Sequence, residues 1–375
     1  AVRRTGEEMS VFSTKVLPPT AAAIEEAAHL LRAGEVVAFP TETVYGLGAN
    51  GLDAAACARI YEAKGRPSDN PLILHIADLA MVYDVAADVP PTAAHLFTAF
   101  APGPLTVILP KAPHIPDIVT GGLPTVGVRC PDHDTARRLI RAAGVPIAAP
   151  SANTSGRPSP TTAAMVYADM VGRIPLILDG GSCRWGVEST IVDCTEEGRV
   201  TILRPGAVTR EMIAAELPHA DVCMDAALTA EDEAPRAPGM KYTHYAPRVP
   251  LTVYVGTGAD VTRALREEFL RRTAAGGIPA LIAGDETIGA LSGLVPAERT
   301  YNCGTRGDHG AFASCLYDAL RHFDGMPVTS LLAEGTAAEI MENPASITGQ
   351  YLARKKFIPV PSRRRTGSGN FIEIV

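Results

Sequence analysis

The feature that most constrains the fold is an alternation of short apolar runs with helical stretches between residues 16 and 207. Strands are predicted for the runs EVVAFP, PLILHIA, PLTVILP, TVGVRCP, PIAAPS, LILDGG, STIVDC and VTILRPG. Helices are predicted from Thr20 to near Gly34, from Asp53 to Arg66, in AAHLFTAF, and around 135–143 and 161–171. This order is typical of an α/β sheet domain.

A second α/β unit is predicted for residues 251–362, with strands in LTVYVG, PALIAG and TSLLAEG and helices in DVTRALREEFLRRTAA and GAFASCLYDALRHF. Residues 208–250 are predicted as a linker because they carry a short helix, the acidic TAEDEAPR and the proline-rich APGMKYTHYAPRVP. Two tyrosines, a histidine and a methionine are unusual in a simple spacer. Residues 363–375 are predicted as a tail.

The composition excludes several classes of protein. With 46% hydrophobic and 20% charged residues, the chain is typical of soluble globular proteins. The net charge of −7 means that any contact with nucleic acid would need a local basic patch. The seven cysteines form no C-x-x-C pair, so neither a disulfide framework nor a metal site is predicted. No apolar run approaches the roughly 18 residues of a membrane span, and the first residues do not resemble a signal peptide. We therefore expect a cytoplasmic protein without a membrane partner.

One glycine pattern suggests a nucleotide-binding motif but lacks its context. Gly46, Gly48 and Gly51 spell G-x-G-x-x-G between a predicted strand and a predicted helix. The polar Thr-Glu-Thr before them has no place in the dinucleotide-binding fingerprint, in which an apolar strand runs into the turn. A nicotinamide site is therefore not predicted.

The stretch KGRPSDNPL follows the predicted helix that ends near Arg66. Lys64 supplies a point charge, Arg66 supplies a planar fork, and Gly65 permits close approach of the backbone. This combination suits a polyphosphate. The alternative is a solvated helix end followed by a turn.

Other polar segments also follow predicted strands. PTETVYGL places two threonines and a glutamate after one strand, and ligands of open α/β sheets bind at such strand ends. APSANTSGRPSPT is rich in hydroxyl and amide groups that could bind sugar and phosphate oxygens, although a surface loop would look the same. Arg129 and Arg204 end strands, where a buried arginine requires an anionic partner. His75 ends another strand and is equally compatible with a structural role.

The chain shows no Ser-His-Asp order, no acid/base pair of carboxylates and no metal-ligand cluster. Its candidate residues are cations and hydroxyl groups, which favours catalysis by positioning and electrostatic stabilisation. This inventory is similar to that of a nucleotidyl-transfer site to which the nucleotide brings Mg²⁺.

Taken together, FPTETVYGLGAN, KGRPSDNPL, PGPLTVIL, VGVRCPDH, PSANTSGRPSPT, EST and ILRPG resemble the YrdC-type threonylcarbamoyl-adenylate synthases. APGMKYTHYAP resembles the linker of the long form of this family, which carries an additional domain. AEIMENPAS departs from the long-form pattern in that domain. The resemblance implies a YrdC-like catalytic domain with a twisted mixed sheet over 16–207, a linker with a lid motif over 208–250, and a smaller Rossmann-like α/β domain over 251–362.

The resemblance also implies a nucleotidyltransferase that converts L-threonine, bicarbonate and ATP into threonylcarbamoyl-AMP and pyrophosphate. A separate transferase complex would then modify tRNA. The residues implied for threonine are Thr43, His75, Arg129, Ala149 and Ser189. The residues implied for ATP, which would carry Mg²⁺, are Lys64, Arg66, Asn70, Thr125, Ser151, Asn153, Ser159, Arg204 and Tyr245. Lys64 and Arg66 would also act in catalysis.

Two other functions are compatible with parts of the sequence. An RNA-binding module of translation could use a basic face of the sheet and the basic tail SRRR. Such a module would bind RNA in a salt-dependent manner and release no pyrophosphate. A carbamoyl-transfer maturation domain would need zinc-finger and acylphosphatase-like neighbours, which the sequence lacks.

Overall fold

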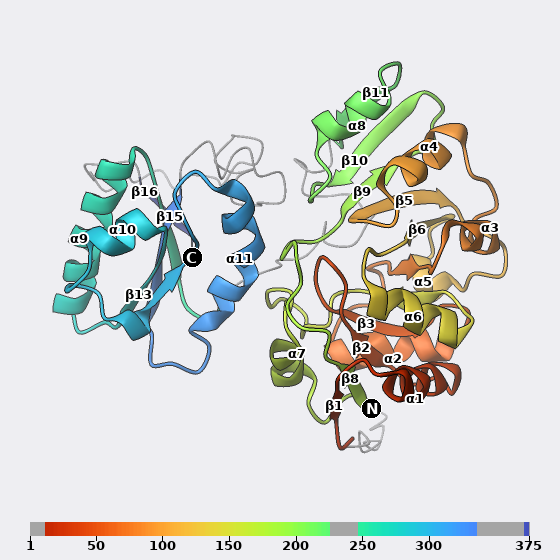
Figure 1. The fold of residues 1–375 in the computed structure, drawn as a ribbon, viewed down its shortest axis with the longest axis horizontal. Helices are drawn as coiled ribbons and strands as arrows, with labels where there is room; N and C mark the ends of the chain where they lie inside the picture. Colours follow the sequence, from red (N-terminus) through yellow and green to blue (C-terminus); the bar gives the residue numbers. More distant parts are fainter. Residues whose placement is uncertain (1–11, 226–246, 336–370, 375) are drawn as a thin grey trace, which may run out of the picture. The chain divides into compact units, whose positions relative to one another are not determined.

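The computed structural model describes residues 12–225, 247–335 and 371–374, which fall into an N-terminal and a C-terminal unit (Figure 1). No helix among these residues is long and apolar enough to cross a membrane.

The N-terminal unit is built on one sheet of mixed strand direction, with the order β1-β8-β2-β3-β7-β4-β6-β5-β9-β10-β11. The strands are β1 (Lys15–Leu17), β2 (Val37–Phe39), β3 (Gly46–Asn50), β4 (Ile73–His75), β5 (Leu105–Pro110), β6 (Thr125–Arg129), β7 (Ile147–Ala149), β8 (Leu176–Leu178), β9 (Thr190–Asp193), β10 (Arg199–Arg204) and β11 (Asp221–Met224). β4 and β6 are parallel, whereas β7 runs antiparallel to β4 and β5 runs antiparallel to β6. The expected α/β class and mixed sheet are confirmed.

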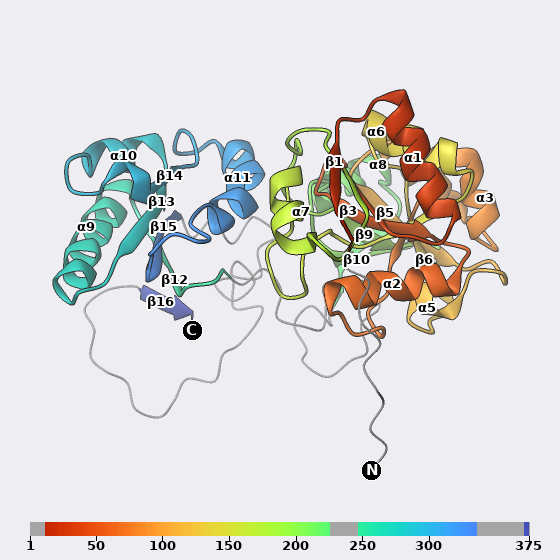
Figure 2. The ribbon, with the colours of Figure 1, turned by 90° about the horizontal axis from the view of Figure 1, so that it is seen from below.

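Helices cover both faces of this sheet. They are α1 (Ala21–Arg32), α2 (Ala54–Lys64), α3 (Val82–Val85), α4 (Pro91–Phe100), α5 (Asp117–Thr120), α6 (Asp134–Ala143), α7 (Ala163–Met170) and α8 (Arg210–Glu216). Figure 2 shows α1 and α6 on one face and α2 and α5 on the other. Strand residues alternate between the two cores: Val37 and Phe39 pack with α1 and α6, and Ala38 packs on the opposite side.

The helix starts follow local rules that the sequence displays. Thr20 caps α1 by accepting a hydrogen bond from the backbone N–H of Ala23, and Asp53 caps α2 in the same way through Ala55 and Ala56. Gly65 ends α2 in the left-handed region with φ of 62°, a conformation that costs glycine little. The short turn at Gly65 therefore places Lys64 and Arg66 on either side of a sharp change in chain direction.

The G-x-G-x-x-G glycines serve strand packing. Gly48 and Gly51 lie in and just after β3, where a Cβ on Gly48 would lie 2.6 Å from Ile147 Cγ2. A Cβ on Gly51 would lie 2.5 Å from Leu74 Cδ2 and 2.9 Å from the Pro146 carbonyl oxygen. The glycines at these two positions therefore allow the neighbouring strands to pack closely against β3.

The N-terminal unit extends past the boundary at residue 207 that the sequence suggested. α8 follows β10 within the same unit, and β11 pairs in parallel with β10, with Val200 opposite Val222. The physical reason is that Ile213 and Val222 are apolar and join the core beneath the sheet. The described part of the unit thus runs to Met224, and residues 226–246 lie outside the described residues.

The C-terminal unit contains a five-stranded sheet in the order β14-β13-β15-β12-β16. The strands are β12 (Leu251–Val255), β13 (Pro279–Ala283), β14 (Thr300–Asn302), β15 (Ser330–Gly335) and β16 (Phe371–Ile374), and the helices are α9 (Gly258–Ala274), α10 (Asp285–Ala290) and α11 (His309–His322). The first four strands are parallel, and β16 is antiparallel to β12. Part of the expected tail therefore forms a strand, and α9 and α11 flank the sheet (Figure 1).

Candidate functional site

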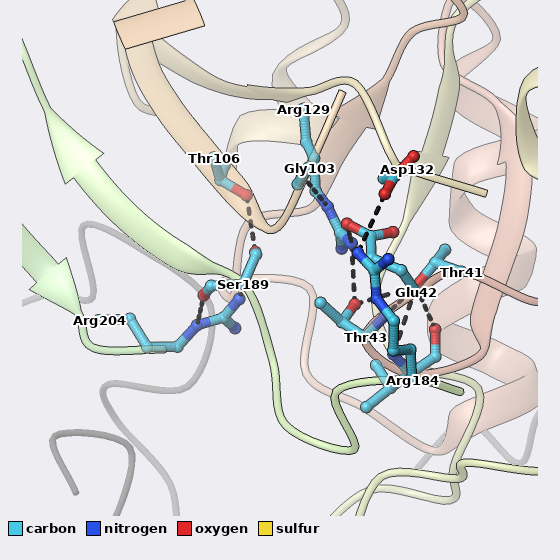
Figure 3. Close-up of polar contacts among 11 residues, drawn as sticks. Thr41, Glu42, Thr43, Gly103, Thr106, Arg129, Asp132, Arg184, Ser189 and Arg204 are labelled. Atoms are coloured by element: carbon cyan, nitrogen blue, oxygen red, sulfur yellow. Dashed lines mark hydrogen bonds and ion pairs between the residues drawn. The ribbon is translucent and has the colours of Figure 1, made fainter. Parts of the chain in front are cut away.

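A buried turn of Thr41, Glu42 and Thr43 connects β2 to β3. The Thr41 hydroxyl donates to the Val44 carbonyl at 2.6 Å and accepts from the backbone N–H groups of Thr43 and Val44. These short-range bonds hold the turn in one conformation. The turn therefore directs the side chains of Glu42 and Thr43 into the interior of the domain, where Figure 3 shows them beside Arg129.

Arg129 ends β6 and is 4% exposed. Its Nη2 donates to Thr43 Oγ1 at 2.9 Å and lies 2.7 Å from Glu42 Oε1, and its Nε donates to the Gly103 carbonyl at 3.4 Å (Figure 3). A buried guanidinium requires such partners because the protein interior solvates charge poorly. The anionic partner that the sequence argument required for Arg129 is therefore Glu42.

His75 ends β4 directly beside Arg129, since the two residues are partners in the parallel ladder. Burial and, to a smaller extent, the nearby Arg129 charge lower the pKa of His75 from 6.5 to about 3, while the backbone carbonyls of Ile73 and Ile147 act in the opposite direction. Nδ1 lies 3.1 Å from the Ile73 carbonyl oxygen, which favours a proton on Nδ1. His75 is therefore a neutral imidazole at neutral pH.

A second polar group surrounds Ser189, which precedes β9. The Ser189 hydroxyl lies 2.8 Å from the Thr106 hydroxyl, and it accepts a hydrogen bond from Arg204 Nη2 at 3.0 Å. Arg204 Nε also donates to the Ser189 carbonyl at 3.0 Å (Figure 3). The two strand-end arginines thus lie in different environments, one against a carboxylate and the other against hydroxyl and carbonyl oxygens.

Lys64 is the last residue of α2 and is 2% exposed. Its Nζ donates to the carbonyls of Ser151 and Asn153, the latter at 2.6 Å, and lies 3.3 Å from Asn153 Oδ1. Burial holds the pKa of Lys64 well below 10.5, and the charge of Arg66 acts in the same direction, whereas Asp169 and Glu188 oppose both. An anion placed beside this amine would favour its positively charged form.

The loop after β7 is held by its own polar side chains. Ser151 Oγ donates to Asn153 Oδ1 at 2.5 Å, and Asn153 Nδ2 donates to the carbonyls of Thr154 and Arg157 at 2.9 and 2.8 Å. Ser159 Oγ donates to Glu188 Oε1. The segment is therefore ordered by internal bonds and differs from a loose surface loop.

Arg66 and Asn70 also meet. Arg66 Nη2 donates to the Asn70 and Pro71 carbonyls at 3.3 and 3.2 Å, and Tyr61 Oη donates to the same Asn70 carbonyl at 3.0 Å. The side-chain amide of Asn70 is fully buried and has no hydrogen-bond partner among the described residues. An unpaired buried amide is costly, so it marks a place where a bound ligand would supply the missing partner.

The structure thus brings together most of the residues that the sequence singled out. Thr43, Arg129 and His75 form one group, Ser189 with Arg204 a second, Lys64 with Ser151 and Asn153 a third, and Arg66 with Asn70 a fourth. Ala149 ends β7 and pairs with Ile73, and Thr125 begins β6 opposite Pro110. Neither makes a side-chain bond to these groups in the described structure. Tyr245 lies outside the described residues.

Sequence reasoning left three residues of these groups without a role. Glu42, Thr106 and Glu188 are 2%, 0% and 8% exposed and contact Arg129, Ser189 and Ser159. For Glu42 the signal was present, because it closely follows an apolar strand, at the end where ligands of open α/β sheets bind. Among the described residues, no group of three or more His, Cys, Asp or Glu side chains could hold a metal ion.

Two family models match successive parts of the chain, and their boundary lies before α8 and β11, which the structure includes in the N-terminal unit. The family model Sua5_yciO_yrdC, described as "Telomere recombination", matches residues 29–206. A second model, described as "Threonylcarbamoyl-AMP synthase, C-terminal domain", matches residues 208–345.

Similar proteins carry the same description. A threonylcarbamoyl-AMP synthase of Bacillus subtilis is 47% identical over 317 residues, which cover 83% of this chain and 87% of that protein. A threonylcarbamoyl-AMP synthase of Pyrococcus abyssi is 44% identical over 314 residues, with 83% and 88% covered. The crystal structure of Pyrococcus abyssi Sua5 complexed with L-threonine superimposes with a TM-score of 0.79 at 40% identity and covers 91% of this chain and 96% of that one.

Proposed function

The chain belongs to the Sua5-type threonylcarbamoyl-AMP synthases, which join a YrdC-type domain to a Sua5 C-terminal domain, and from this premise we propose how its residues divide the substrates. It is a nucleotidyltransferase that makes threonylcarbamoyl-AMP for the threonylcarbamoyladenosine modification of tRNA. The substrates that we propose are L-threonine, bicarbonate and ATP, with pyrophosphate and water as the other products.

We assign threonine to the group around Arg129. The observation that carries this assignment is a buried arginine at a strand end whose neighbours are a hydroxyl, a carboxylate and a neutral imidazole. Its contacts among the described residues use Nε and Nη2, so Nη1 is available to a carboxylate. Arginine binds carboxylates through paired N–H donors, and Thr43 and Ser189 offer hydroxyl groups for the threonine side chain. The backbone at Ala149 and the ring of His75 complete the proposed threonine site.

We assign the triphosphate to Lys64 and Arg66. Both lie at the end of α2, and Lys64 is surrounded by neutral oxygens of Ser151 and Asn153 that orient its amine without neutralising it. The buried amide of Asn70 would find its missing partner on the nucleotide. Thr125, Ser151, Asn153, Ser159 and Arg204 supply the remaining donors in this proposal.

The proposed chemistry depends on positioning. The amine of threonine and bicarbonate form a carbamate with loss of water, and a carbamate oxygen attacks the α-phosphorus of ATP while pyrophosphate leaves. Lys64 and Arg66 stabilise the charge that develops on the phosphates, because fixed cations in a water-poor site need no reorganisation. Mg²⁺ enters with ATP as part of the substrate, and the phosphates supply its main ligands.

Carbamates decompose readily in water, so the reaction needs a closed site. We propose that the linker, with Tyr245, covers the nucleotide as a lid and that a separate transferase complex takes the product to tRNA. We place the reaction in the cytoplasm because ATP and the tRNA to be modified are available there. The C-terminal unit has no assigned role in the chemistry.

The experiment that tests this function is a pyrophosphate-release assay in which threonine, bicarbonate and ATP are omitted one at a time. We expect release only with all three present. Equal turnover without threonine would overturn the assignment. Salt-dependent RNA binding without any pyrophosphate release would instead support a binding module.

A further inference from the structure

Glu42 carries acceptor sites that the protein leaves unfilled. Both carboxylate oxygens are buried, and neither receives a hydrogen bond from the described residues. Oε1 lies 2.7 Å from Arg129 Nη2 as an ion pair, but this contact does not have the geometry of a hydrogen bond. A buried carboxylate normally accepts several hydrogen bonds, because those bonds compensate for the water that it has lost. The ion pair alone therefore leaves Glu42 short of donors.

The charges around Glu42 limit what could supply those donors. Arg129 is the adjacent cation, and the charge of Glu42 also acts on Cys130, His133 and Cys183. Burial raises the pKa of both thiols to about 11 and about 12, and it lowers the pKa of His133. All three are neutral near pH 7. The local charge of Glu42 and Arg129 together is zero.

A free α-amino acid matches this arrangement. It carries one positive and one negative group on adjacent carbons and has no net charge, so it can lie beside a buried ion pair without adding a net charge to the interior. The carboxylate of the amino acid would face the guanidinium of Arg129, and its ammonium group would face the carboxylate of Glu42. Each charged group of the ligand would then lie beside a group of opposite charge. An ammonium group has three donors in rotatable directions, which suits a carboxylate that lacks partners.

We propose that Glu42 binds the α-ammonium group of threonine and thereby selects an amino acid over a hydroxy or simple carboxylic acid. This proposal rests on the assignment of threonine to the Arg129 group. The turn around Thr41 supports it, because the four hydrogen bonds of the Thr41 hydroxyl hold Glu42 at the side of Arg129 before any ligand arrives. Such prior order reduces the entropic cost of binding.

The alternative role for Glu42 is to hold Arg129 in place, and the two roles differ in which ligands they affect. (R)-3-Hydroxybutyrate is L-threonine with hydrogen in place of the ammonium group. A residue that only orients Arg129 affects both ligands alike, since both carry the carboxylate. A residue that binds the ammonium group affects threonine alone.

The test measures the dissociation constants of L-threonine and (R)-3-hydroxybutyrate in the full chain by calorimetry or competition. In Glu42→Gln, which removes the charge and keeps the shape, we expect threonine to bind about 30-fold or more weakly and hydroxybutyrate to change by less than about threefold. Glu35→Gln is the matched control, because Glu35 pairs with Arg59 on the surface at 2.6 Å and should alter neither constant.

Equal weakening of both ligands, or unchanged threonine binding, would overturn the inference. Thermal melting checks that the variants fold, and Glu42→Asp provides a second variant that keeps the charge but withdraws it by one methylene. In Glu42→Asp, the preference for threonine over (R)-3-hydroxybutyrate, measured as the ratio of their affinities, should also fall. A wild-type chain that releases no threonine-dependent pyrophosphate would contradict the proposed function itself, whereas an active chain with an unchanged ratio in both variants would contradict only the role of Glu42.

Discussion

Lys64 and Asn153 are separated by 89 positions in the chain, yet Lys64 Nζ donates to the Asn153 carbonyl at 2.6 Å and lies 3.3 Å from its side-chain oxygen. One buried amine thus connects the end of α2 to the loop that follows β7. All of its acceptors are neutral oxygens, including the carbonyl of Ser151. The contact therefore positions the amine without cancelling its charge, which is the arrangement that a polyphosphate ligand requires.

Replacing Lys64 or Arg66 with Ala should reduce threonylcarbamoyl-AMP formation by about 100-fold or more, because a fixed cation at the transferring phosphate is lost. Pyrophosphate release measures the effect. Lys64→Ala should also increase hydrogen exchange in the loop after β7, since the amine holds two of its carbonyls. Lys15→Ala is the control, because Lys15 forms a surface pair with Glu26 at 2.7 Å. A wild-type rate in either variant would restore the interpretation of KGRPSDNPL as a solvated helix end.

Arg129→Lys should weaken threonine far more than ATP. Lysine cannot reproduce the planar fork, and losing a charged pair at a buried site costs about 2–5 kcal/mol. Calorimetry with each substrate separately measures the two affinities. Unchanged threonine affinity would show that Arg129 serves another purpose in the site.

His75 should make the protein less stable as the pH falls. Burial lowers its pKa to about 3 in the folded state, whereas an unfolded chain has the ordinary value of about 6.5. Between these values the unfolded state binds a proton that the folded state does not, so the free energy of unfolding decreases as the pH falls through this window. Between about pH 7 and about pH 5, the titration of His75 lowers the free energy of unfolding by about 2 kcal/mol.

The variant His75→Gln lacks the titrating imidazole, so its free energy of unfolding should fall less steeply over the same pH range. Urea unfolding at each pH measures the difference, and His29→Gln on the exposed side of α1 is the control. Parallel pH profiles for wild type and His75→Gln would show that His75 is not buried as a neutral group.

The linker prediction concerns residues that lie outside the described structure. Replacing 239–246 with Gly and Ser should lower activity sharply while both units stay folded, because a lid protects the labile carbamate from water. ATP should protect the linker of the wild-type chain from protease, and the variant should lose this protection. Full activity of the variant would mean that the linker is only a tether.

Local features could be predicted because their causes lie within a few residues. Thr20 and Asp53 cap helices through bonds to N–H groups two or three residues ahead, and Gly65 ends α2 because glycine tolerates positive φ. The strand runs of the central sheet alternate between two cores, as their apolar composition suggests. The sequence underestimated the extent of the sheets, because β11 and β16 are only four residues long, too short for a clear alternating pattern, and β16 pairs with a strand far from it in the chain.

The sequence by itself determined the α/β class, the ends of helices such as α1 and α2, and the set of cations and hydroxyls from which a site could be built. Only the tertiary structure decided that Glu42 lies against Arg129 and that Lys64 is buried beneath the loop of Ser151 and Asn153. Local sequence controls backbone conformation and periodic burial, whereas the partner of a buried charge depends on which strands become neighbours. The order of the strands depends on the packing of the whole sheet, and a short stretch of sequence does not specify it.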